Sequence, residues 1–417
     1  MMRKLGFVVS IFALVMVALA CRLPGFSSPA PGEISPTAEV NLPAETQPQG
    51  QTPTNTSTTA PTSTSTTQPT PSLPVFDDPI IFNFEFFTPT KGWAVTQYGN
   101  KLLITEDGGQ TWLDAVPTSL YPLPADITSL SIESFFLDET TAWLRPNAPA
   151  GAMLYHTQDG GRKWAATSVP FDNARYFFVN LLDGFALEDL GAGAGSHYVA
   201  LHQTSDGGNS WMQVFTHEPG ESKSLPESGS KSGLTFLDED RGWVGGVIPM
   251  TDYFYLYTTS DGGVTWTQET DISLPSMFAG SMLEVWQPFF IDSTTGYLPV
   301  RALASGGEMH LLIYRSDDSG QTWGFQDSIQ DGRSVDFFTV DEGWAAAGSS
   351  LYNTSDGAET WSSASTSGIP AGEFLLRVDF VDSQHGWVLG TPDESTWTPL
   401  NLYHTTDGGA NWIQLLP

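Results

Sequence analysis

Seven aspartates recur in one eight-residue pattern, Ser/Thr-x-Asp-x-Gly-x-x-Trp, and they are the most regularly spaced reactive groups of the chain. They are Asp107, Asp159, Asp206, Asp261, Asp318, Asp356 and Asp407. A carboxylate in a tight turn can accept hydrogen bonds from N–H groups of its own turn, and glycine tolerates the positive φ that such turns often need. Seven equivalent carboxylates are therefore interpreted as structural rather than catalytic. The sixth copy has Ala358 at the glycine position, so we expect its turn to be the least regular.

Other reactive groups give weaker signals. Cys21 is the only cysteine, so the later part of the chain has no catalytic or zinc-binding thiol. The histidines show no metal-ligand spacing such as His-x-x-x-His, and we predict neither a metal nor a cofactor. A glycosidase needs two facing carboxylates, but the 47 Asp and Glu residues always allow some pair to be imagined. We predict that the protein is not an enzyme.

A second motif alternates with the first and defines the elements that must hold it. Before each box an apolar run leads to Gly-aromatic, as in Gly92-Trp93 and Gly386-Trp387, with Ala142-Trp143 as the exception. Each repeat therefore predicts four strands, A to D: A is the apolar run, B starts at Gly-aromatic, C leads into the box and D leaves it. Four-stranded sheets of this kind bury both faces when arranged radially. The predicted fold is all-β, a seven-bladed β-propeller with four-stranded antiparallel blades over residues 77–417.

The N-terminal part is predicted to be a targeting segment and a tether. Residues 1–20 have a positive start and an apolar run typical of a signal peptide, and Ala18-Leu19-Ala20-Cys21 matches a bacterial lipobox. An uncleaved N-terminal anchor is the alternative. Residues 21–76 then comprise the lipidated cysteine and a Thr-, Pro- and Ser-rich disordered linker. We expect an exported protein that Cys21 anchors to the outer face of a bacterial membrane.

The formal charge of −31 limits the partners. Charges in residues 1–76 balance, so the excess belongs to the predicted propeller. Such a surface repels nucleic acid and anionic lipid, and membrane contact is expected through the lipid anchor only. We expect a monomer with a protein or a glycan as partner.

The two interleaved motifs resemble those of the photosystem II stability/assembly factor family over residues 80–417. This resemblance implies an exported, non-enzymatic, seven-bladed propeller. Sialidases, sortilin-type receptors and xyloglucan-cleaving glycosidases contain related Asp-box propellers, but this chain has Arg145-Pro146 without the Arg-Ile-Pro of sialidases. We expect a protein-binding scaffold or assembly factor, and the alternative is a carbohydrate-binding or glycosidase propeller.

Strand direction predicts two different faces. The A–B turns and the C–D boxes share one, the box face, and the longer B–C and D–A loops share the other, the loop face, where binding residues are expected. Trp286 and Trp397 lie outside both motifs, the first in the D–A connection entering blade five and the second in the B–C connection of blade seven. With Arg301, assigned to the B–C loop of blade five, they are predicted to border a partner-binding groove over blade six. Alternatively, both tryptophans pack under their own loops. The ring is expected to close by packing of blade one against blade seven.

The anchor gives the first testable prediction. Radiolabelled palmitate should be incorporated into the wild-type chain and not into Cys21→Ala, because only the thiol of Cys21 can be acylated. Equal labelling of both proteins would disprove the lipid anchor.

Overall fold

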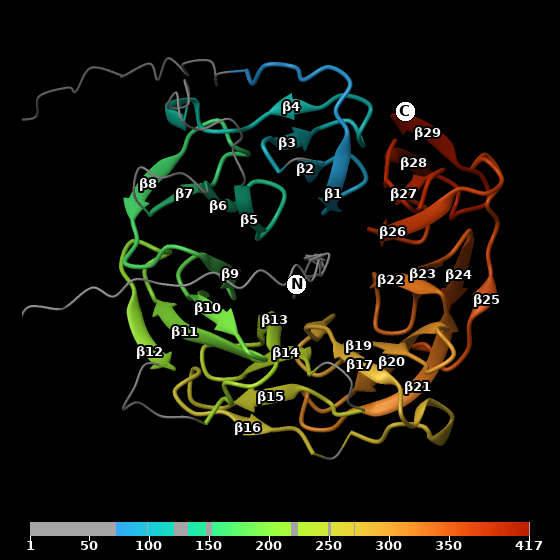
Figure 1. Ribbon diagram of the computed structural model, residues 1–417. Coiled ribbons are helices and arrows are strands. Elements are labelled where there is room, and N and C mark those ends of the chain that lie inside the picture. Colours follow the sequence, from blue (N-terminus) through green and yellow to red (C-terminus); the bar gives the residue numbers. More distant parts are fainter. Residues whose placement is uncertain are drawn as a thin grey trace, which may run out of the picture. The chain divides into compact units, whose positions relative to one another are not determined.

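The computed structural model describes residues 72–97, 99–120, 132–146, 152–217, 224–248, 252–270 and 272–416. Cys21 and the predicted signal peptide lie outside this part. The described residues form seven antiparallel sheets that succeed one another around a ring (Figure 1), which confirms the predicted propeller. The helices in the described ranges are two short 3-10 turns, Thr118–Leu120 and Ser276–Phe278. No helix in the described ranges is long and apolar enough to cross a membrane.

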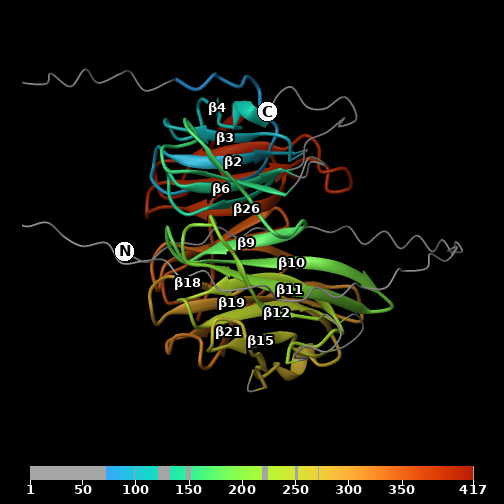
Figure 2. The same cartoon turned by 90° about the vertical axis from the view of Figure 1, so that its left-hand side faces the viewer.

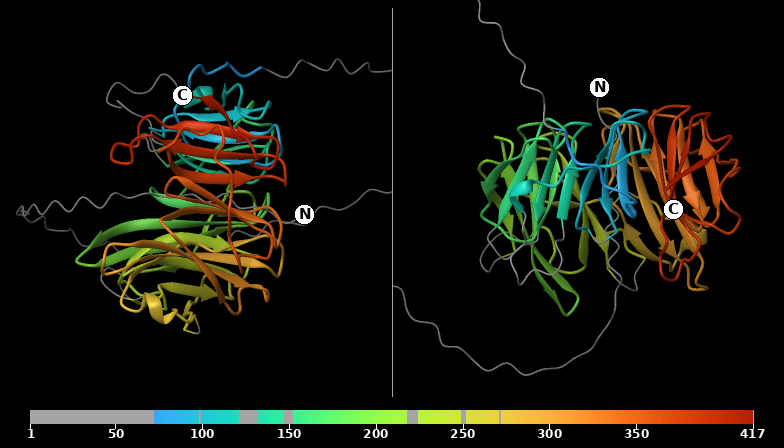
Figure 3. Two further views of the ribbon diagram at one scale, coloured as in Figure 1. Left: turned by 90° about the vertical axis from the view of Figure 1, so that its right-hand side faces the viewer. Right: turned by 90° about the horizontal axis from the view of Figure 1, so that it is seen from above.

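The strands follow the predicted order A, B, C, D. Blade one contains β1 (Ile81–Phe86), β2 (Gly92–Thr96), β3 (Leu102–Thr105) and β4 (Leu113–Asp114). Blade two contains β5 (Ile132–Phe136), β6 (Ala142–Pro146), β7 (Met153–Thr157) and β8 (Ala165–Ser168). Blade three contains β9 (Ala174–Phe178), β10 (Gly184–Gly193), β11 (Ser196–Thr204) and β12 (Met212–Thr216). Blade four contains β13 (Ser230–Phe236), β14 (Gly242–Val247), β15 (Leu256–Thr259) and β16 (Thr267–Gln268). The β10–β11 hairpin projects beyond its neighbours (Figures 2 and 3).

Blade five departs from four strands because its strand A is broken. It contains β17 (Met282–Val285), β18 (Phe289–Phe290), β19 (Gly296–Leu303), β20 (Met309–Ser316) and β21 (Gly324–Gln330), and both β17 and β18 pair with β19. Blades six and seven are regular. Blade six contains β22 (Gly332–Phe337), β23 (Gly343–Ala347), β24 (Ser350–Thr354) and β25 (Ser362–Ser363). Blade seven contains β26 (Phe374–Phe380), β27 (Gly386–Thr391), β28 (Asn401–Thr405) and β29 (Ile413–Leu416).

One aromatic pair joins each blade to the next, and its rings are stacked at every junction except that of Trp243 with Phe290, where they are tilted by 34°. The aromatic residue that starts strand B lies over the phenylalanine that ends strand A of the following blade. The pairs are Trp93–Phe136, Trp143–Phe178, Phe185–Phe236, Trp243–Phe290, Tyr297–Phe337, Trp344–Phe380 and Trp387–Phe86. Their ring centroids are between 3.4 Å and 5.4 Å apart. The repeat therefore encodes its inter-blade contact as well as its own hairpin.

The glycine before each aromatic residue makes room for this stack. It stands opposite the phenylalanine of its own hairpin, as Gly242 does to Phe236. A Cβ at the six glycines would lie 2.3 Å to 2.7 Å from that ring. Blade two has Ala142 here, opposite Phe136, and the stack on Phe136 is the widest, at 5.4 Å. We attribute this wider spacing to the methyl group of Ala142.

The ring closes by packing of the first blade against the last, as predicted. Strand β1 pairs with β2 of its own blade and not with blade seven. Across the seam, Phe86 stacks on Trp387 at 3.5 Å, and its backbone N–H donates to Asp379 Oδ2 at 2.7 Å. The N–H of Phe380 donates in the same way to Asp336 of blade six. These carboxylates, of the buried Asp379 and the half-buried Asp336, satisfy N–H groups at the free inner edge of strand A.

The residues just before β1 extend blade one on its outer side. The N–H of Phe76 donates to the carbonyl of Trp112, and that of Asp114 donates to the carbonyl of Pro74, both at 2.8 Å. Val75 pairs with Leu113 as an isolated bridge, and Leu73 packs against the core cluster of blades one and two. The chain therefore enters the propeller along the outermost strand of blade one.

The stack predicts the effect of adding one methyl group. Gly242→Ala should destabilise the protein by about 1–3 kcal/mol, because the new Cβ displaces Phe236 from its stack on Phe185. Gly193→Ala is the matched control, since a Cβ there meets nothing within 4 Å, and it should change stability by less than about 0.5 kcal/mol. Denaturant melts of both variants measure the difference. Equal effects would show that the glycine does not protect the stack.

Candidate functional site

The seven box aspartates lie in C–D turns that share one geometry. In each turn, the hydroxyl of the Ser or Thr two residues before the aspartate makes the buried hydrogen bond. In blade three, Thr204 Oγ1 accepts from the N–H of Gly208 at 3.0 Å and donates to Asp206 Oδ1 at 2.8 Å. Asp206 also accepts from the N–H and the hydroxyl of Ser210, at 2.8 Å and 2.6 Å, on the exposed side of the turn. These bonds account for the structural role expected of the box carboxylates.

Six of the seven box aspartates have a lowered pKa; they are Asp107, Asp206, Asp261, Asp318, Asp356 and Asp407. For Asp407 the largest cause is the side-chain hydrogen bond from Asn411, which helps to bring its pKa to about 2. Hydrogen bonds to a carboxylate favour the charged form. The carboxylates are therefore held ionised and are poorly suited to act as general acids.

The sixth box is as regular as the others, so the expectation for Ala358 was wrong. The N–H of Ala358 still donates to Thr354 Oγ1 at 3.1 Å, and Ala358 adopts the left-handed φ of 71° itself. At the equivalent Gly320 and Gly409, a Cβ would lie 2.3 Å and 2.4 Å from a tryptophan of the preceding blade. The preceding blade here contributes Tyr297 instead, whose smaller ring leaves room for the methyl group.

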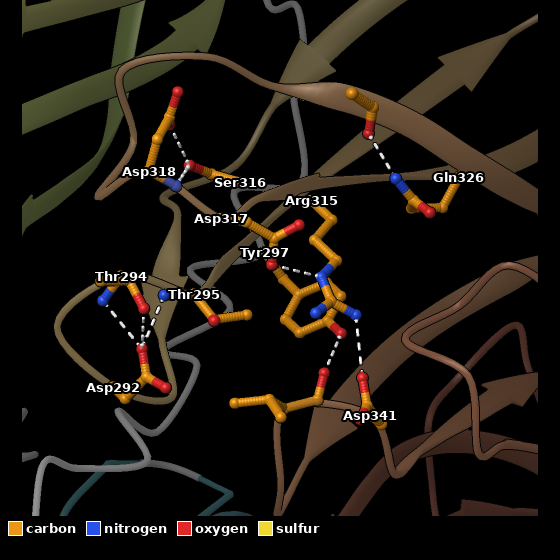
Figure 4. A network of polar contacts seen from close by, with 12 residues as sticks. Asp292, Thr294, Thr295, Tyr297, Arg315, Ser316, Asp317, Asp318, Gln326 and Asp341 are labelled. Atoms are coloured by element: carbon orange, nitrogen blue, oxygen red, sulfur yellow. Dashed lines mark hydrogen bonds and ion pairs between the residues drawn. The ribbon is translucent and has the colours of Figure 1, made fainter.

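Arginines on the box face tie neighbouring blades together. Arg315 donates from Nε to Asp317 at 2.8 Å and from Nη1 to Asp341 of blade six at 3.1 Å (Figure 4). Arg162 pairs with Glu106 of blade one at 2.6 Å, and Arg241 donates to a carbonyl of blade five at 3.1 Å. These three arginines bond to neighbouring blades and so stabilise the ring.

The structure does not form the predicted groove over blade six. Trp286 follows β17 directly, its N–H donates to the carbonyl of Pro299 at 3.1 Å, and its side chain is only 8% exposed in the core between blades five and six. It belongs to the broken strand A rather than to the D–A connection. Arg301 lies within β19, not in the B–C loop, and pairs with Glu284 at 3.1 Å. The pairing of β17 with the far half of β19 causes both corrections.

Trp397 does lie in the B–C connection of blade seven, as predicted. It is half-buried, has a φ of 56°, and its carbonyl accepts a hydrogen bond from Gln97 of blade one at 3.5 Å. The backbone of Trp397 therefore contacts blade one, and Trp397 does not lie in the core that contains Trp286. A binding role for Trp397 or Arg301 stays a prediction.

A buried polar cluster between blades two and three is the strongest candidate site, and sequence reasoning missed it. Glu133 of β5 stands opposite Arg145 of β6, and Tyr176 faces them from blade three. Beside Tyr176, Glu188 accepts from His202 Nε2 at 2.8 Å. In the sequence, the only sign of this cluster is the presence of charged residues in strands that are otherwise apolar.

This cluster holds buried polar atoms that the described protein leaves unpaired. They are Arg145 Nε, Tyr176 Oη and His202 Nδ1, on side chains that are 7%, 8% and 4% exposed. Burial raises the pKa of Glu133, although Arg175 and Arg145 both oppose the rise. Buried polar groups are normally hydrogen-bonded, so such a group of exceptions indicates a place where water or a ligand can enter.

Further cations lie at the loop-face ends of the innermost strands. Arg175 Nη1 contacts the carbonyl of Ser232, and Lys231 Nζ donates to the carbonyls of His197 and Glu227 at 2.8 Å and 3.1 Å. Lys231 is 1% exposed, and burial lowers its pKa to about 8. The described residues contain no group of three or more His, Cys, Asp or Glu side chains that could hold a metal ion.

No known family model and no curated protein sequence matches this chain. Among solved structures, YCF48 bound to a D1 peptide is 18% identical with a TM-score of 0.50, covering 81% of this chain and 100% of its own. YCF48 from Cyanidioschyzon merolae is 20% identical with a TM-score of 0.50, covering 76% and 95%. An oligogalacturonate lyase from Vibrio parahaemolyticus is 10% identical with a TM-score of 0.51, covering 81% and 92%. These likenesses define a class by fold, that of the seven-bladed propellers, which holds binding proteins and enzymes alike.

The box geometry predicts a ranking of two substitutions. Thr204→Val should cost about 1–3 kcal/mol, because it leaves the buried N–H of Gly208 without a partner. Asp206→Ala should cost less, about 0.5–1 kcal/mol, because water can replace its exposed bonds. Thermal melts at neutral pH measure both, and the opposite order would contradict this account.

The lowered pKa values also fix the sign of the pH dependence. The boxes stabilise the fold above the ordinary carboxyl pKa, and this contribution is lost as the pH falls through the folded-state values, to about 2 for Asp407. The cost of Asp206→Ala should therefore shrink as melts are repeated from pH 5 toward pH 2. A cost that stays constant over this window would show that the carboxylate charge contributes nothing.

Proposed function

We propose that this chain is an exported, lipid-anchored propeller without enzymatic activity, and that it binds a protein partner on its loop face as a monomeric scaffold or assembly factor. The observation that carries the proposal is the placement of its cations. In a chain of net charge −31, buried or half-buried cations gather at the loop-face ends of the inner strands; they are Arg145, Arg175, Lys231 and Arg333. Two of these, Arg145 and Arg333, have an Nε without a hydrogen-bond partner in the described protein, although Arg333 Nη2 already pairs with Glu394.

Unpaired guanidinium donors favour an acidic or carbonyl-rich partner. An arginine presents a planar fork of donors that matches carboxylates and backbone carbonyls. The surrounding negative surface disfavours long anionic polymers, so a segment with a few well-placed acceptors fits better than nucleic acid. The solved structure of YCF48 bound to a D1 peptide supports a peptide partner, because it is a propeller of the same fold that binds one.

The proposed anchor restricts where the partner is met. Acylation of Cys21 would hold the propeller at the outer face of the membrane through the Thr-, Pro- and Ser-rich linker predicted for residues 21–76. Partners are therefore expected among membrane proteins with segments exposed on that side.

A glycan-binding or glycan-cleaving propeller is the second candidate. Burial raises the pKa of Glu133 but Glu188 lies next to His202, so the cluster holds two carboxyl groups in different environments. Such a difference is what separates an acid from a base in glycosidases.

The test compares two pairs of arginine substitutions in the full chain. Arg145→Gln with Arg333→Gln should reduce cross-linking to partner proteins in host membranes by about tenfold or more. Arg162→Gln with Arg241→Gln, the same change on the box face, should leave cross-linking unchanged. Melting curves confirm that each variant is folded.

The outcomes separate the two candidates. Unchanged cross-linking in the loop-face variant would contradict a partner site at these arginines. Selective retention on a glycan array, lost on Glu133→Gln, would instead favour the carbohydrate function.

A further inference from the structure

The A–B turn of blade three carries two exposed leucines, unlike any other A–B turn. Leu181 is 43% exposed and Leu182 is 57% exposed. The corresponding residue pairs elsewhere are Pro89-Thr90, Glu139-Thr140, Glu239-Asp240, Ser293-Thr294, Val340-Asp341 and Ser383-Gln384. Two adjacent exposed aliphatic side chains mark a place where apolar contact is used.

The backbone of this turn is held rigid. Asn180 Oδ1 accepts from the N–H groups of Leu182 and Asp183, at 2.7 Å and 2.9 Å. The carbonyl of Leu182 accepts from the N–H of Gly207 in the adjacent box at 2.8 Å. The leucines are therefore presented in a fixed position, which lowers the entropy that a binding partner must overcome.

A hollow of about 550 Å³ adjoins the leucines, between blades two and three. Its wall includes His156, Gln158 and Asp206. His156 stacks on Trp143 at 4.5 Å, and its Nε2 is a buried atom without a hydrogen-bond partner in the described protein. The hollow thus offers an apolar rim, one carboxylate and one unused polar atom.

The face around the hollow is strongly acidic. The seven A–B turns and seven boxes contain 20 Asp and Glu residues against four Lys and Arg residues. Two of those four cations, Arg162 and Arg241, are already bonded to neighbouring blades. The excess negative charge of this face attracts cations and repels the same face of a second copy of this chain.

We propose that this hollow is a docking site for a basic polypeptide segment that carries an aliphatic side chain. The aliphatic group packs against Leu181 and Leu182, and the neighbouring Lys or Arg side chains lie over the box carboxylates. The site is on the face opposite to the loop face, so it is independent of the function proposed above. A scaffold with both sites can hold two partners of opposite charge at once.

The probe is a short peptide of lysines with two leucines, titrated against the full chain. It should bind more tightly than a version with serines for the leucines, and far more tightly than one with glutamates for the lysines. Leu181→Ser with Leu182→Ser should weaken binding by about tenfold or more. Gln158→Lys should weaken it too, by placing a positive charge in the hollow.

The matched control removes apolar side chains that are exposed elsewhere. Met277→Ser with Ile413→Ser, residues that are 75% and 68% exposed, should leave the affinity unchanged. Equal losses in the control and in the leucine variant would overturn the proposal, as would equal binding of the lysine and glutamate peptides. A chain that sediments as a dimer and becomes monomeric on Leu181→Ser with Leu182→Ser would also overturn it, because the face would then be a self-interface.

Discussion

The stack of a strand-B aromatic ring on the phenylalanine of the next blade is the interaction on which the ring depends. An aromatic pair of this kind occurs at all seven junctions, stacked at six of them, including the seam where Trp387 meets Phe86, and tilted between Trp243 and Phe290. In six blades a glycine without a Cβ lies opposite the phenylalanine, so three residues of the repeat are fixed together: the phenylalanine, the glycine and the aromatic residue that follows it. Blade two has Ala142 in place of the glycine. Large buried aromatic pairs contribute both area and orientation, so they fix the angle between blades.

This constraint also divides the two faces of the molecule. The stack lies at the box-face end of strands A and B, and the strand-B ring can also bond to the box of the next blade, as Trp387 Nε1 donates to the carbonyl of Gly108. That end is rigid and repetitive. The other end of each strand is free of the stack, and there the blades diverge: β10 and β11 lengthen, strand A of blade five breaks, and charged side chains enter the interior.

The fold could be predicted from the sequence because each repeat contains the residues that form its own turns and its own core. The seven blades, the structural boxes and the mode of ring closure all follow from local patterns. What could not be predicted depends on contacts between repeats or on irregular pairing. Trp286 was misplaced because nothing local shows that β17 pairs with the far half of β19. Ala358 was misjudged because its fit depends on Tyr297 in another blade, and Glu133 meets Tyr176 only when blades two and three pack.

The pairing of residues 74–76 with the outer strand of blade one has a mechanical consequence. Tension applied to the chain from its N-terminal side acts first on the bonds between Phe76 and Trp112 and between Pro74 and Asp114. These few bonds lie on the outer side of blade one, whereas the seam contact between Phe86 and Trp387 lies at the end of β1, further along the chain. Pulling would therefore strip a short peripheral segment before the load reached the seam. The pairing of residues 74–76 would thus protect ring closure from tension on the N-terminal side of the chain.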